Sequence, residues 1–376
     1  SCSLVGSEMC IRDREKALRT AAEADVAVIF AGLPEIFESE GYDRTSMKLP
    51  QCQDRLIEEV LKVQPNVVVV LHNGSPVELP WADKVSAILE MYLGGQGVGE
   101  ACDRLLYGEA NPSGRLAETF PYRLEDNPSY LHFPGNGKRV LYGEDIFVGY
   151  RYYDTKKVLV RYAFGHGLSY TEFAYGDLNL SSAQMTDEDI LTVSFKVKNT
   201  GKTEGKEVVQ LYVADLCGIS ERPVKELKEF AKVHLLPGEE KTVSMEILAR
   251  DLSYYEERLG DWYAPSGTYR ILIGHASDDI RLHADIVFET QKELPFRVDF
   301  TTTFGELLDH TKTAPVITEL LAPLAAAAAS AEGMSDEYKK LGEQVIREMP
   351  MKSLLGQMPG EQVEQLIGQL NCLLAQ

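Results

Sequence analysis

The sequence predicts an α/β domain, followed by an all-β domain and a helical tail. Three observations lead to this fold class. Continuous apolar runs alternate with helical stretches over residues 15–120, short alternating segments follow over residues 173–290, and apolar residues recur at helical spacing after residue 304. Buried runs between helices are typical of a mainly parallel sheet, and short alternating strands are typical of an antiparallel sandwich.

The first domain, residues 15–120, has strands that are apolar throughout and helices that are apolar on one face. In chain order we expect a helix at 15–24, a strand at 25–31, a helix at 49–64, strands at 66–74 and 85–95, and a helix at 97–108. Gly108 is placed to cap the last helix. Strands of this kind predict a parallel sheet covered by helices on both faces. Three strands are few for such a sheet, so we expect a domain truncated at its N-terminus.

The first fourteen residues, SCSLVGSEMCIRDR, differ from a natural start. They lack an initiator methionine and the basic head and apolar centre of a signal peptide. The segment resembles a translated sequencing adapter, and we expect residues 1–14 to be a non-native artefact. The natural protein is then expected to begin earlier, which makes this chain a fragment.

Residues 121–172 are rich in Pro, Gly and Tyr and show little periodicity. We expect an interdomain linker there, since long stretches without clear structure are commonly functional or packed between domains. Over residues 173–290 the pattern changes to short alternating strands. The clearest lie at 191–199, 206–214, 241–248, 267–274 and 281–288. Strands of this length and spacing predict an antiparallel sandwich of immunoglobulin-like size.

Residues 291–376 are predicted to form a helical C-terminal extension. Five apolar residues share one helical stripe there: Val363, Leu366, Ile367, Leu370 and Leu374. Such a stripe packs against another apolar surface. Packing on the body of the protein and a homo-oligomer interface are both open, and the former is favoured.

The net charge of -20 and the isoelectric point of about 4.8 argue against nucleic acid or an anionic membrane as a partner, because both require a basic face. No apolar run reaches the ~18 residues that a membrane-spanning helix needs. The six cysteines are scattered without a C-x-x-C pair, which excludes a zinc knuckle or a thioredoxin-like motif. Free thiols favour a reducing compartment, and we therefore expect a cytoplasmic protein.

Three further kinds of site lack support in the sequence. Gly95, Gly97 and Gly99 follow a predicted strand, but their spacing differs from the dinucleotide-binding G-x-G-x-x-G pattern. The seven histidines are isolated and lack H-E-x-x-H spacing, and we expect His275 and His283 to be surface residues of the sandwich. A serine-hydrolase elbow of the G-x-S-x-G type does not occur. We therefore expect neither a metal site nor a cofactor.

A short acidic loop follows the first buried strand. The stretch FESEGYDR carries Glu38, Glu40 and Asp43 and ends in Arg44, which is placed to pair with Asp43. Gly41 allows a sharp turn beside Glu40. Loops beyond strand ends commonly carry the chemistry of α/β proteins, and glycoside hydrolysis needs two carboxyl groups, one of which protonates the leaving oxygen. The loop suits that acid, although a solvated acidic loop is the plainer interpretation of these residues alone.

Seven motifs along residues 15–290 resemble those of one enzyme family. They are ESEGYDRTSMKLPQCQDRLI, VVVVLHNGSPVELPW, YGEANPSGRLAETFP, VLYGEDIFVGYRYYD, AFGHGLSYTEF, VKNTGKTEGKEVVQLYV and KELKEFAKVHLLPGE. Together they are similar to the C-terminal half of a glycoside hydrolase family 3 β-glucosidase, and the tail is similar to the extension of some bacterial members. The resemblance implies a β/α barrel at the N-terminus of the complete protein, then an α/β sandwich domain, then a fibronectin III-like domain.

The resemblance also implies an activity, the retaining hydrolysis of terminal non-reducing β-D-glucosyl residues. In this family the barrel carries the aspartate nucleophile, and the α/β sandwich supplies the acid/base glutamate. Carried over to the E-G-Y-D-R pattern, Glu40 is the acid/base, and Glu38 is the alternative because loop alignments slide by a residue or two. This chain then lacks the nucleophile, so we expect it to be inactive alone. Its expected partners are a β-glucoside or short oligosaccharide and the missing barrel domain.

Two other interpretations stay open. One is a β-xylosidase, α-arabinosidase or N-acetylglucosaminidase of the same family, because the motifs do not determine the sugar. The other is a non-catalytic carbohydrate-binding or adhesive module, suggested by a fibronectin III-like part that stands without the barrel.

Overall fold

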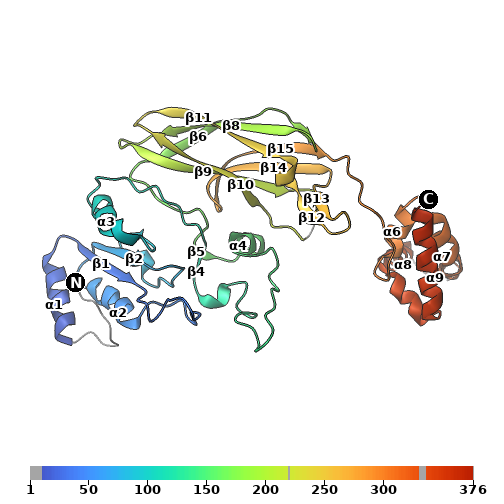
Figure 1. Cartoon of the computed structure of the whole chain (residues 1–376), viewed down its shortest axis with the longest axis horizontal. Helices are drawn as coiled ribbons and strands as arrows, with labels where there is room; N and C mark the ends of the chain where they lie inside the picture. Colours follow the sequence, from blue (N-terminus) through green and yellow to red (C-terminus); the bar gives the residue numbers. More distant parts are fainter. Residues whose placement is uncertain (1–10, 219–220, 330–335, 376) are drawn as a thin grey trace. The chain divides into compact units, whose positions relative to one another are not determined.

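The computed structural model describes residues 11–218, 221–329 and 336–375. The chain divides into two compact units, Ser1–Tyr255 with Trp262–Gln291, and Glu256–Asp261 with Lys292–Gln376. The first unit contains the α/β region and the β-sandwich, and the second contains the helical tail (Figure 1). Of the segment 1–14 expected to be non-native, residues 1–10 lie outside the described part, and residues 11–14 begin the first helix.

The α/β region is built on a three-stranded parallel sheet in the order β1-β2-β3. Its elements are α1 (Ile11–Glu23), β1 (Ala27–Gly32), α2 (Gln51–Val60), β2 (Val67–His72), β3 (Ala87–Glu90) and α3 (Val98–Leu106). The predicted parallel sheet is thus confirmed. β3 is shorter than predicted, because Tyr92 adopts a positive φ of 48° that a strand does not contain. Gly108 follows α3 with φ +74°, in the conformation expected of the predicted cap.

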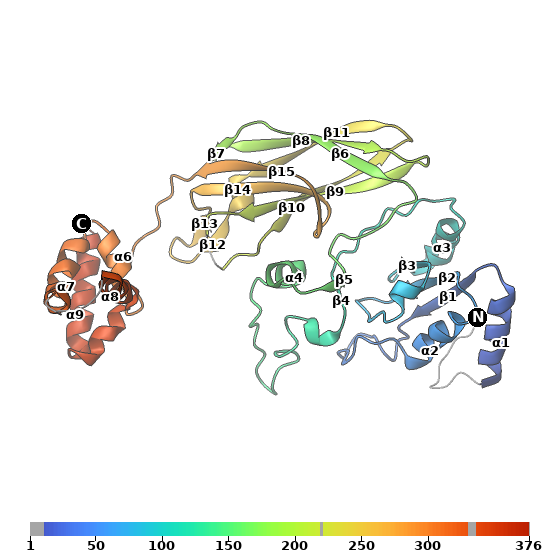
Figure 2. The ribbon, with the colours of Figure 1, turned by 180° about the vertical axis from the view of Figure 1, so that it is seen from behind.

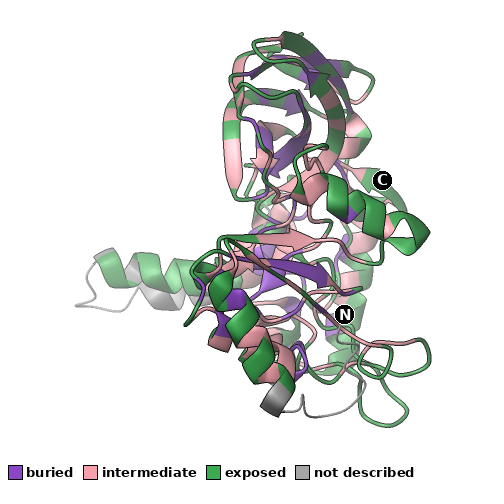
Figure 3. Ribbon diagram, turned by 90° about the vertical axis from the view of Figure 1, so that its left-hand side faces the viewer, coloured by how far each residue is buried: buried purple, intermediate pink, exposed green. Residues whose placement is uncertain are grey.

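The two faces of this sheet are buried to different extents. Val67, Val69 and Leu71 of β2 pack with side chains of α1 and α2 in one core cluster. The opposite face of β1 carries Val28 and Phe30, which are 42% and 61% exposed. The prediction of helices on both faces is therefore wrong at β1, the edge strand, where the described chain leaves these side chains in solvent. Figure 3 shows buried residues gathered on the strands and exposed residues on the outer sides of the helices.

Residues 121–172, predicted as a linker, contain regular structure. β4 (Phe120–Pro121) pairs antiparallel with β5 (Val160–Tyr162), and α4 (Tyr150–Lys156) precedes β5. The rings of Phe120 and Tyr162 lie edge to face, with centroids 6.4 Å apart, and both contribute to the α/β core. These elements are too short for their periodicity to be recognised in the sequence. They bring the segment back onto the α/β region.

The all-β region is a two-sheet sandwich of mainly antiparallel strands, as predicted (Figure 2). Its main strands are β6 (Phe173–Leu180), β7 (Gln184–Thr186), β8 (Ile190–Asn199), β9 (Gly205–Asp215), β10 (Glu226–Leu235), β11 (Glu240–Leu248), β14 (Gly267–Ala276) and β15 (Asp279–Glu289). One sheet has the order β10-β9-β14-β15-β7 and the other β11-β8-β6. A short helix, α5 (Ala249–Leu252), and a hairpin of β12 (Tyr254–Glu256) and β13 (Asp261–Tyr263) lie between β11 and β14 in the chain.

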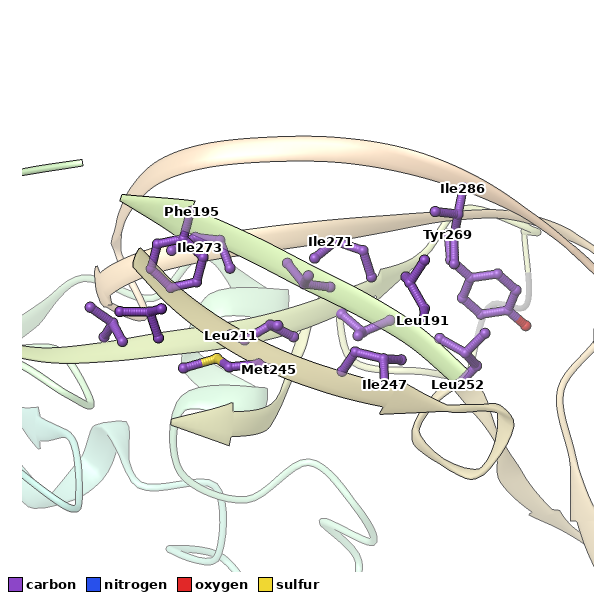
Figure 4. Packing of buried hydrophobic residues seen from close by; sticks show 14 of the residues in the cluster. Leu191, Phe195, Leu211, Met245, Ile247, Leu252, Tyr269, Ile271, Ile273 and Ile286 are labelled. Carbon is purple, nitrogen blue, oxygen red and sulfur yellow. The ribbon is translucent and has the colours of Figure 1, made fainter. Parts of the chain in front are cut away.

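The core of the sandwich forms between its two sheets (Figure 4). Leu191 and Phe195 lie on β8, and Ile271 and Ile273 lie on β14, each at most 2% exposed. Alternation along a strand sends every second side chain to the same face, which is why these positions were recognisable in the sequence. Burying one such side chain contributes about 1.5–3 kcal/mol, so the sandwich has a core of its own.

A buried ionic network attaches the segment before the sandwich to its strands. Glu207 of β9 is fully buried and accepts hydrogen bonds from Arg115 Nη2 at 2.7 Å and from the Tyr175 hydroxyl at 2.7 Å. Its Oε1 also lies 2.6 Å from Nδ1 of His275, whose Nε2 lies 2.8 Å from the Gly167 carbonyl oxygen. A carboxylate this deep requires such partners, because removing a charge from water is costly.

The same network corrects one sequence prediction. The His275 side chain is only 18% exposed and lies against Glu207, so it is part of the network and not a surface residue. His283 is exposed, as predicted. Strand alternation alone does not reveal that a connecting segment covers the end of β14.

The second unit is a small helical domain with its own core. Its elements are α6 (Phe304–Asp309), α7 (Ala314–Ala329), α8 (Asp336–Glu348), the 3₁₀ helix η4 (Met351–Gly356) and α9 (Gly360–Leu374). Val363 and Leu370 of α9 are fully buried in a cluster with Phe304, Leu307 and Met351. The predicted stripe therefore packs within the tail itself, because α6, α7 and η4 supply apolar partners. None of the described helices is long and apolar enough to cross a membrane.

Removing Arg115 from the buried network should destabilise the protein strongly. In Arg115→Met the Glu207 carboxylate stays buried without its charged partner, and we expect the free energy of unfolding to fall by about 3 kcal/mol or more. Urea unfolding followed by circular dichroism measures this loss. As a matched control, Arg270→Met breaks the more exposed Arg270–Asp285 pair and should cost about 1 kcal/mol or less. Equal losses in the two variants would contradict the role assigned to the network.

Candidate functional site

Three loops meet at the carboxyl edge of the parallel sheet. They follow β1, β2 and β3, and parallel strands end at the same edge. The first loop is tied to the end of β1 by the Gln53 side chain. Its Oε1 accepts from Gly32 N at 2.9 Å, and its Nε2 donates to the Gly32 carbonyl at 3.0 Å. The acidic stretch at residues 37–44 lies within this loop.

Glu38 is held against the second loop by three donors. Its Oε2 accepts from Gly74 N at 2.6 Å, and its Oε1 accepts from Ser75 Oγ at 2.7 Å and from Arg44 Nη1 at 3.4 Å. A Cβ at position 74 would lie 3.1 Å from Glu38 Oε2, so glycine permits the close approach of backbone and carboxylate. We call these four residues, Glu38, Arg44, Gly74 and Ser75, the Glu38 clamp.

Arg44 extends the clamp along the second loop. Its Nη1 donates to Ser75 Oγ at 2.5 Å, and its Nη2 donates to the Pro76 carbonyl at 3.3 Å. Burial lowers the pKa of Arg44, and the neighbouring Glu38 opposes that shift. An arginine nevertheless stays charged in a protein. It pairs with Glu38, whereas Asp43 is exposed, so the predicted pair of Arg44 with Asp43 is wrong. The guanidinium contacts Glu38 of its own loop and Ser75 and Pro76 of the second loop.

Glu40, the predicted acid/base, is exposed although it lies close to Glu38 in the chain. Within the residues that the structure describes, no hydrogen bond or ion pair restrains its carboxylate. Gly41 follows with φ +94°, a left-handed conformation that glycine adopts without strain. The Tyr42 hydroxyl donates to the Glu35 carbonyl and closes the loop. The two candidate carboxylates therefore differ, because Glu38 is fixed and Glu40 is presented to solvent.

Glu90, at the end of β3, joins the site and was missed in the sequence. Its Oε2 accepts from Asn73 Nδ2 at 3.2 Å, and its Oε1 accepts from Tyr92 N at 2.8 Å. Burial raises the pKa of Glu90 to about 7, and the charges of Glu118 and Glu38 add to the shift. A carboxyl group that titrates near neutral pH is often found at functional sites. The one signal that could have revealed it is a charged residue within an apolar strand.

Glu118, two residues before the start of β4, was also missed. Burial raises the pKa of Glu118, and the charge of Glu38 adds to the shift, whereas nearby Arg44 opposes it. Like charges disfavour one another's ionised form in a poorly solvated site. We call Glu38, Glu90 and Glu118 the acid cluster. No three His, Cys, Asp or Glu side chains of the described ranges are arranged to hold a metal ion.

Both regions of the first unit match known protein domains. Residues 11–170 match the glycosyl hydrolase family 3 C-terminal domain, and residues 207–277 match the fibronectin type III-like domain. The first match contains the acidic loop and the acid cluster. The second match lies within the sandwich, from β9 to the end of β14.

Two curated relatives are similar in sequence. The chain is 47% identical to thermostable beta-glucosidase B of Acetivibrio thermocellus over 360 residues, which cover 95% of this chain and 47% of that protein. It is 45% identical to a beta-glucosidase of Kluyveromyces marxianus over 288 residues, which cover 75% of this chain and 33% of that protein.

Solved structures of beta-glucosidases are also similar to this chain. The Kluyveromyces marxianus beta-glucosidase in complex with glucose aligns with a TM-score of 0.71 and 42% identity, over 76% of this chain and 34% of that chain. The GH3 beta-glucosidase of Bifidobacterium adolescentis aligns with a TM-score of 0.77 and 38% identity, over 84% of this chain and 46% of that chain. The chain thus spans less than half the length of each of these relatives. It belongs to glycoside hydrolase family 3, of which it carries the C-terminal α/β domain and the fibronectin type III-like domain.

Proposed function

We propose that this chain supplies the acid/base carboxylate of a retaining β-glucosidase and that Glu40 is this residue. The relatives that it matches are named beta-glucosidases, and the family resemblance assigns the acid/base to the E-G-Y-D-R pattern. The observation that carries the choice of residue is the different environment of the two glutamates. Three donors engage Glu38, whereas Glu40 is exposed in the loop at the carboxyl edge of the sheet.

The chemistry of the reaction separates the two residues further. The acid/base gives a proton to the glycosidic oxygen and later takes one from water, so it alternates between neutral and ionised forms. The donors from Gly74, Ser75 and Arg44 hold both carboxylate oxygens of Glu38 in place, so this side chain is not free to approach a leaving group. Glu40 has no such partners in the described structure and can meet the leaving group from the side. Glu38 is then a positioning residue, because its clamp holds the loop that carries Glu40.

A retaining mechanism needs a second carboxyl group about 5 Å from the first, to act as the nucleophile. An aspartate of a β/α barrel outside these 376 residues provides it in this proposal, as the family resemblance implies. The active site is then shared between two domains, with a terminal β-D-glucosyl residue bound between the barrel and the acidic loop.

The acid cluster sets the charge next to that loop. Because the pKa of Glu90 is about 7, this residue carries a proton for part of the time near neutral pH. In its neutral form Glu90 adds no negative charge next to the Glu38 clamp, and the clamp is stronger. Glu90 therefore links the stability of the loop to pH.

The isolated chain should not hydrolyse aryl β-glucosides measurably, because it supplies only one of the two carboxyl groups that the reaction needs. Release of nitrophenol from p-nitrophenyl β-D-glucoside over several hours tests this. Turnover that copurifies with the chain and disappears in Glu40→Ala would show that the nucleophile lies within these residues and would contradict the proposal of a shared site.

In the complete enzyme, Glu40→Ala should lower kcat/KM by about 10²–10⁴-fold for glucosides with poor leaving groups, because these depend on protonation. Glucosides with good leaving groups should lose less at the first step, and azide should restore turnover at the second. Steady-state kinetics with matched alkyl and aryl glucosides measure both effects. Asp43→Ala removes another exposed carboxylate of the same loop and should keep kcat/KM within about twofold of the wild type.

Glu38→Gln distinguishes positioning from catalysis in the same assay. It keeps the shape of the side chain but removes the charge that pairs with Arg44. We expect kcat/KM to fall to a similar extent for good and poor leaving groups, without rescue by azide. If Glu38→Gln shows leaving-group dependence and azide rescue while Glu40→Ala does not, the assignment of the two glutamates is reversed.

The stability of the α/β region should fall as pH rises from about 5 to 8. The pKa of Glu90 is about 7 in the fold and 4.5 in its ordinary environment, so the folded state binds the proton more tightly. Protonation of Glu90 therefore stabilises the fold, and this contribution is complete at pH values below 4.5. It is lost as the pH rises through about 7, with a total loss on the order of 2–3 kcal/mol. Glu90→Gln should flatten this profile and be the more stable protein at pH 8.

Urea unfolding at several pH values measures that profile, and the fluorescence of Trp81, which is buried in the α/β core, reports on the right region. A Trp262→Phe background removes the second tryptophan of the chain. The exposed Glu125 provides the control variant Glu125→Gln, which should keep the wild-type slope. Parallel pH profiles for Glu90→Gln and the wild type would show that Glu90 is not the titrating group.

A further inference from the structure

A pocket of about 400 Å³ opens beside the Glu38 clamp. Its walls include Arg44 and Ser75 of the clamp, Thr119 before β4, and Asn127, Glu144 and Tyr153 from the segment that follows. We call it the Thr119 pocket. Its volume falls within the ~300–1,000 Å³ that is typical of small-molecule sites. All of its walls belong to the first compact unit.

Two polar groups of this pocket lack partners in the part of the chain that the structure describes. Thr119 is only 5% exposed, and its Oγ1 is buried without a hydrogen bond. One carboxylate oxygen of Glu144, Oε2, is buried in the same way. An unpaired buried polar atom costs about 1–3 kcal/mol, and native proteins contain few of them. Because both groups line one pocket, a single ligand can satisfy both, and the acid/base chemistry of Glu40 uses neither.

The walls of the pocket select the chemistry of its occupant. A carboxylate only accepts hydrogen bonds, whereas a hydroxyl such as that of Thr119 donates and accepts, so hydroxyl groups of a ligand match both side chains. The carboxylates of Glu118 and Glu144 disfavour an anion. Leu124 and the ring of Tyr153 add apolar surface. A neutral sugar ring meets all of these conditions, because it has hydroxyl groups at its edge and C–H groups on its faces.

The polar groups of the pocket are held in place without a ligand. Asn127 Oδ1 accepts from Ser129 N at 3.0 Å and from Ser129 Oγ at 2.7 Å, which orients both side chains on the pocket wall. Thr119 directly precedes Phe120, which is 2% exposed and anchors β4 in the α/β core. Groups that are already ordered lose little conformational freedom on binding, which favours recognition of a small, weakly bound sugar.

We propose that the Thr119 pocket binds a neutral sugar ring, with Thr119 and Glu144 hydrogen-bonded to its hydroxyl groups. Arg44 and Ser75 belong to both the pocket and the Glu38 clamp, so the pocket adjoins the loop that carries Glu40. Its role in catalysis rests on the proposed function, in which the ring is part of the leaving group of an oligosaccharide substrate. The binding of the sugar itself does not depend on that function.

Titration of the 376-residue chain with cellotriose, followed by saturation-transfer difference NMR of the ligand, tests the proposal. We expect saturable binding in the wild-type chain. Putrescine and inorganic phosphate serve as probes of a cationic and an anionic occupant, and both should bind more weakly than cellotriose.

Four variants assign the binding to the pocket. Thr119→Val keeps the shape of the side chain without the hydroxyl, and Glu144→Gln removes a charged acceptor; each should weaken cellotriose binding about tenfold. Thr119→Ser keeps the hydroxyl, and Glu125→Gln changes an exposed glutamate outside the pocket, so both should bind cellotriose like the wild type. Thr119→Val should also raise the melting temperature of the ligand-free chain, because it removes a buried hydroxyl that has no partner in the described protein.

Absence of saturable cellotriose binding, or equal affinities in all four variants, would overturn the proposal. Tighter binding of putrescine or phosphate would assign the pocket to a charged ligand instead. These results are independent of the Glu40 kinetics, because binding is measured on a chain without turnover. If the sugar binds in the pocket but Glu40→Ala retains full activity in the complete enzyme, only the catalytic assignment fails.

Discussion

The candidate site depends on the contact between the Glu38 carboxylate and the turn that follows β2. The donors at this contact are a backbone amide, a hydroxyl and Arg44, and they come from two loops that the parallel sheet places at one edge. Gly74 makes the contact possible, because any side chain there would crowd the carboxylate. Once Glu38 is fixed in this way, the chain beyond it is committed to a sharp turn at Gly41, and Glu40 is left exposed. One acidic residue of the loop is thus part of the scaffold, whereas the other is exposed to solvent.

Burial gives this edge of the sheet its electrostatic character. Glu90 and Glu118 lie close enough to Glu38 to disfavour one another's charge, and both have raised pKa values chiefly because they are shielded from water. Arg44 is the cation that opposes the accumulation of negative charge at Glu38 and Glu118, and its own guanidinium is partly desolvated. The same low exposure that raises the pKa of Glu90 leaves Thr119 Oγ1 without a hydrogen-bond partner in the described protein. The raised pKa of Glu90 and the unpaired Thr119 hydroxyl therefore have one physical origin, which is incomplete solvation.

The segment between the sheet and the sandwich supports this arrangement from one side. It carries part of the wall of the Thr119 pocket, and β5 and the Tyr162 ring return it to the α/β core. At its other end Arg115 reaches the buried Glu207 of the sandwich. A charge pair with this little solvent exposure tolerates little displacement, because neither ion has water to replace its partner. The sandwich thereby restrains a segment whose own elements are too short to be stable alone.

Local patterns were sufficient to recognise much of this protein. β1 and β2 are unbroken apolar runs and β8 and β9 alternate, so the requirement to bury apolar surface predicts the parallel sheet and the sandwich directly. Glu38 and Glu40 were recognisable as candidates because they lie in one contiguous motif. Only the tertiary structure decided which of them is fixed, since two of the three donors to Glu38, Gly74 N and Ser75 Oγ, lie on another loop. It also decided that Glu90 and Glu118 join the site, and that the apolar stripe of α9 packs inside the tail. A periodic pattern indicates which face of a helix or strand is apolar or charged. Contacts between residues that are distant in the chain depend on how the elements pack.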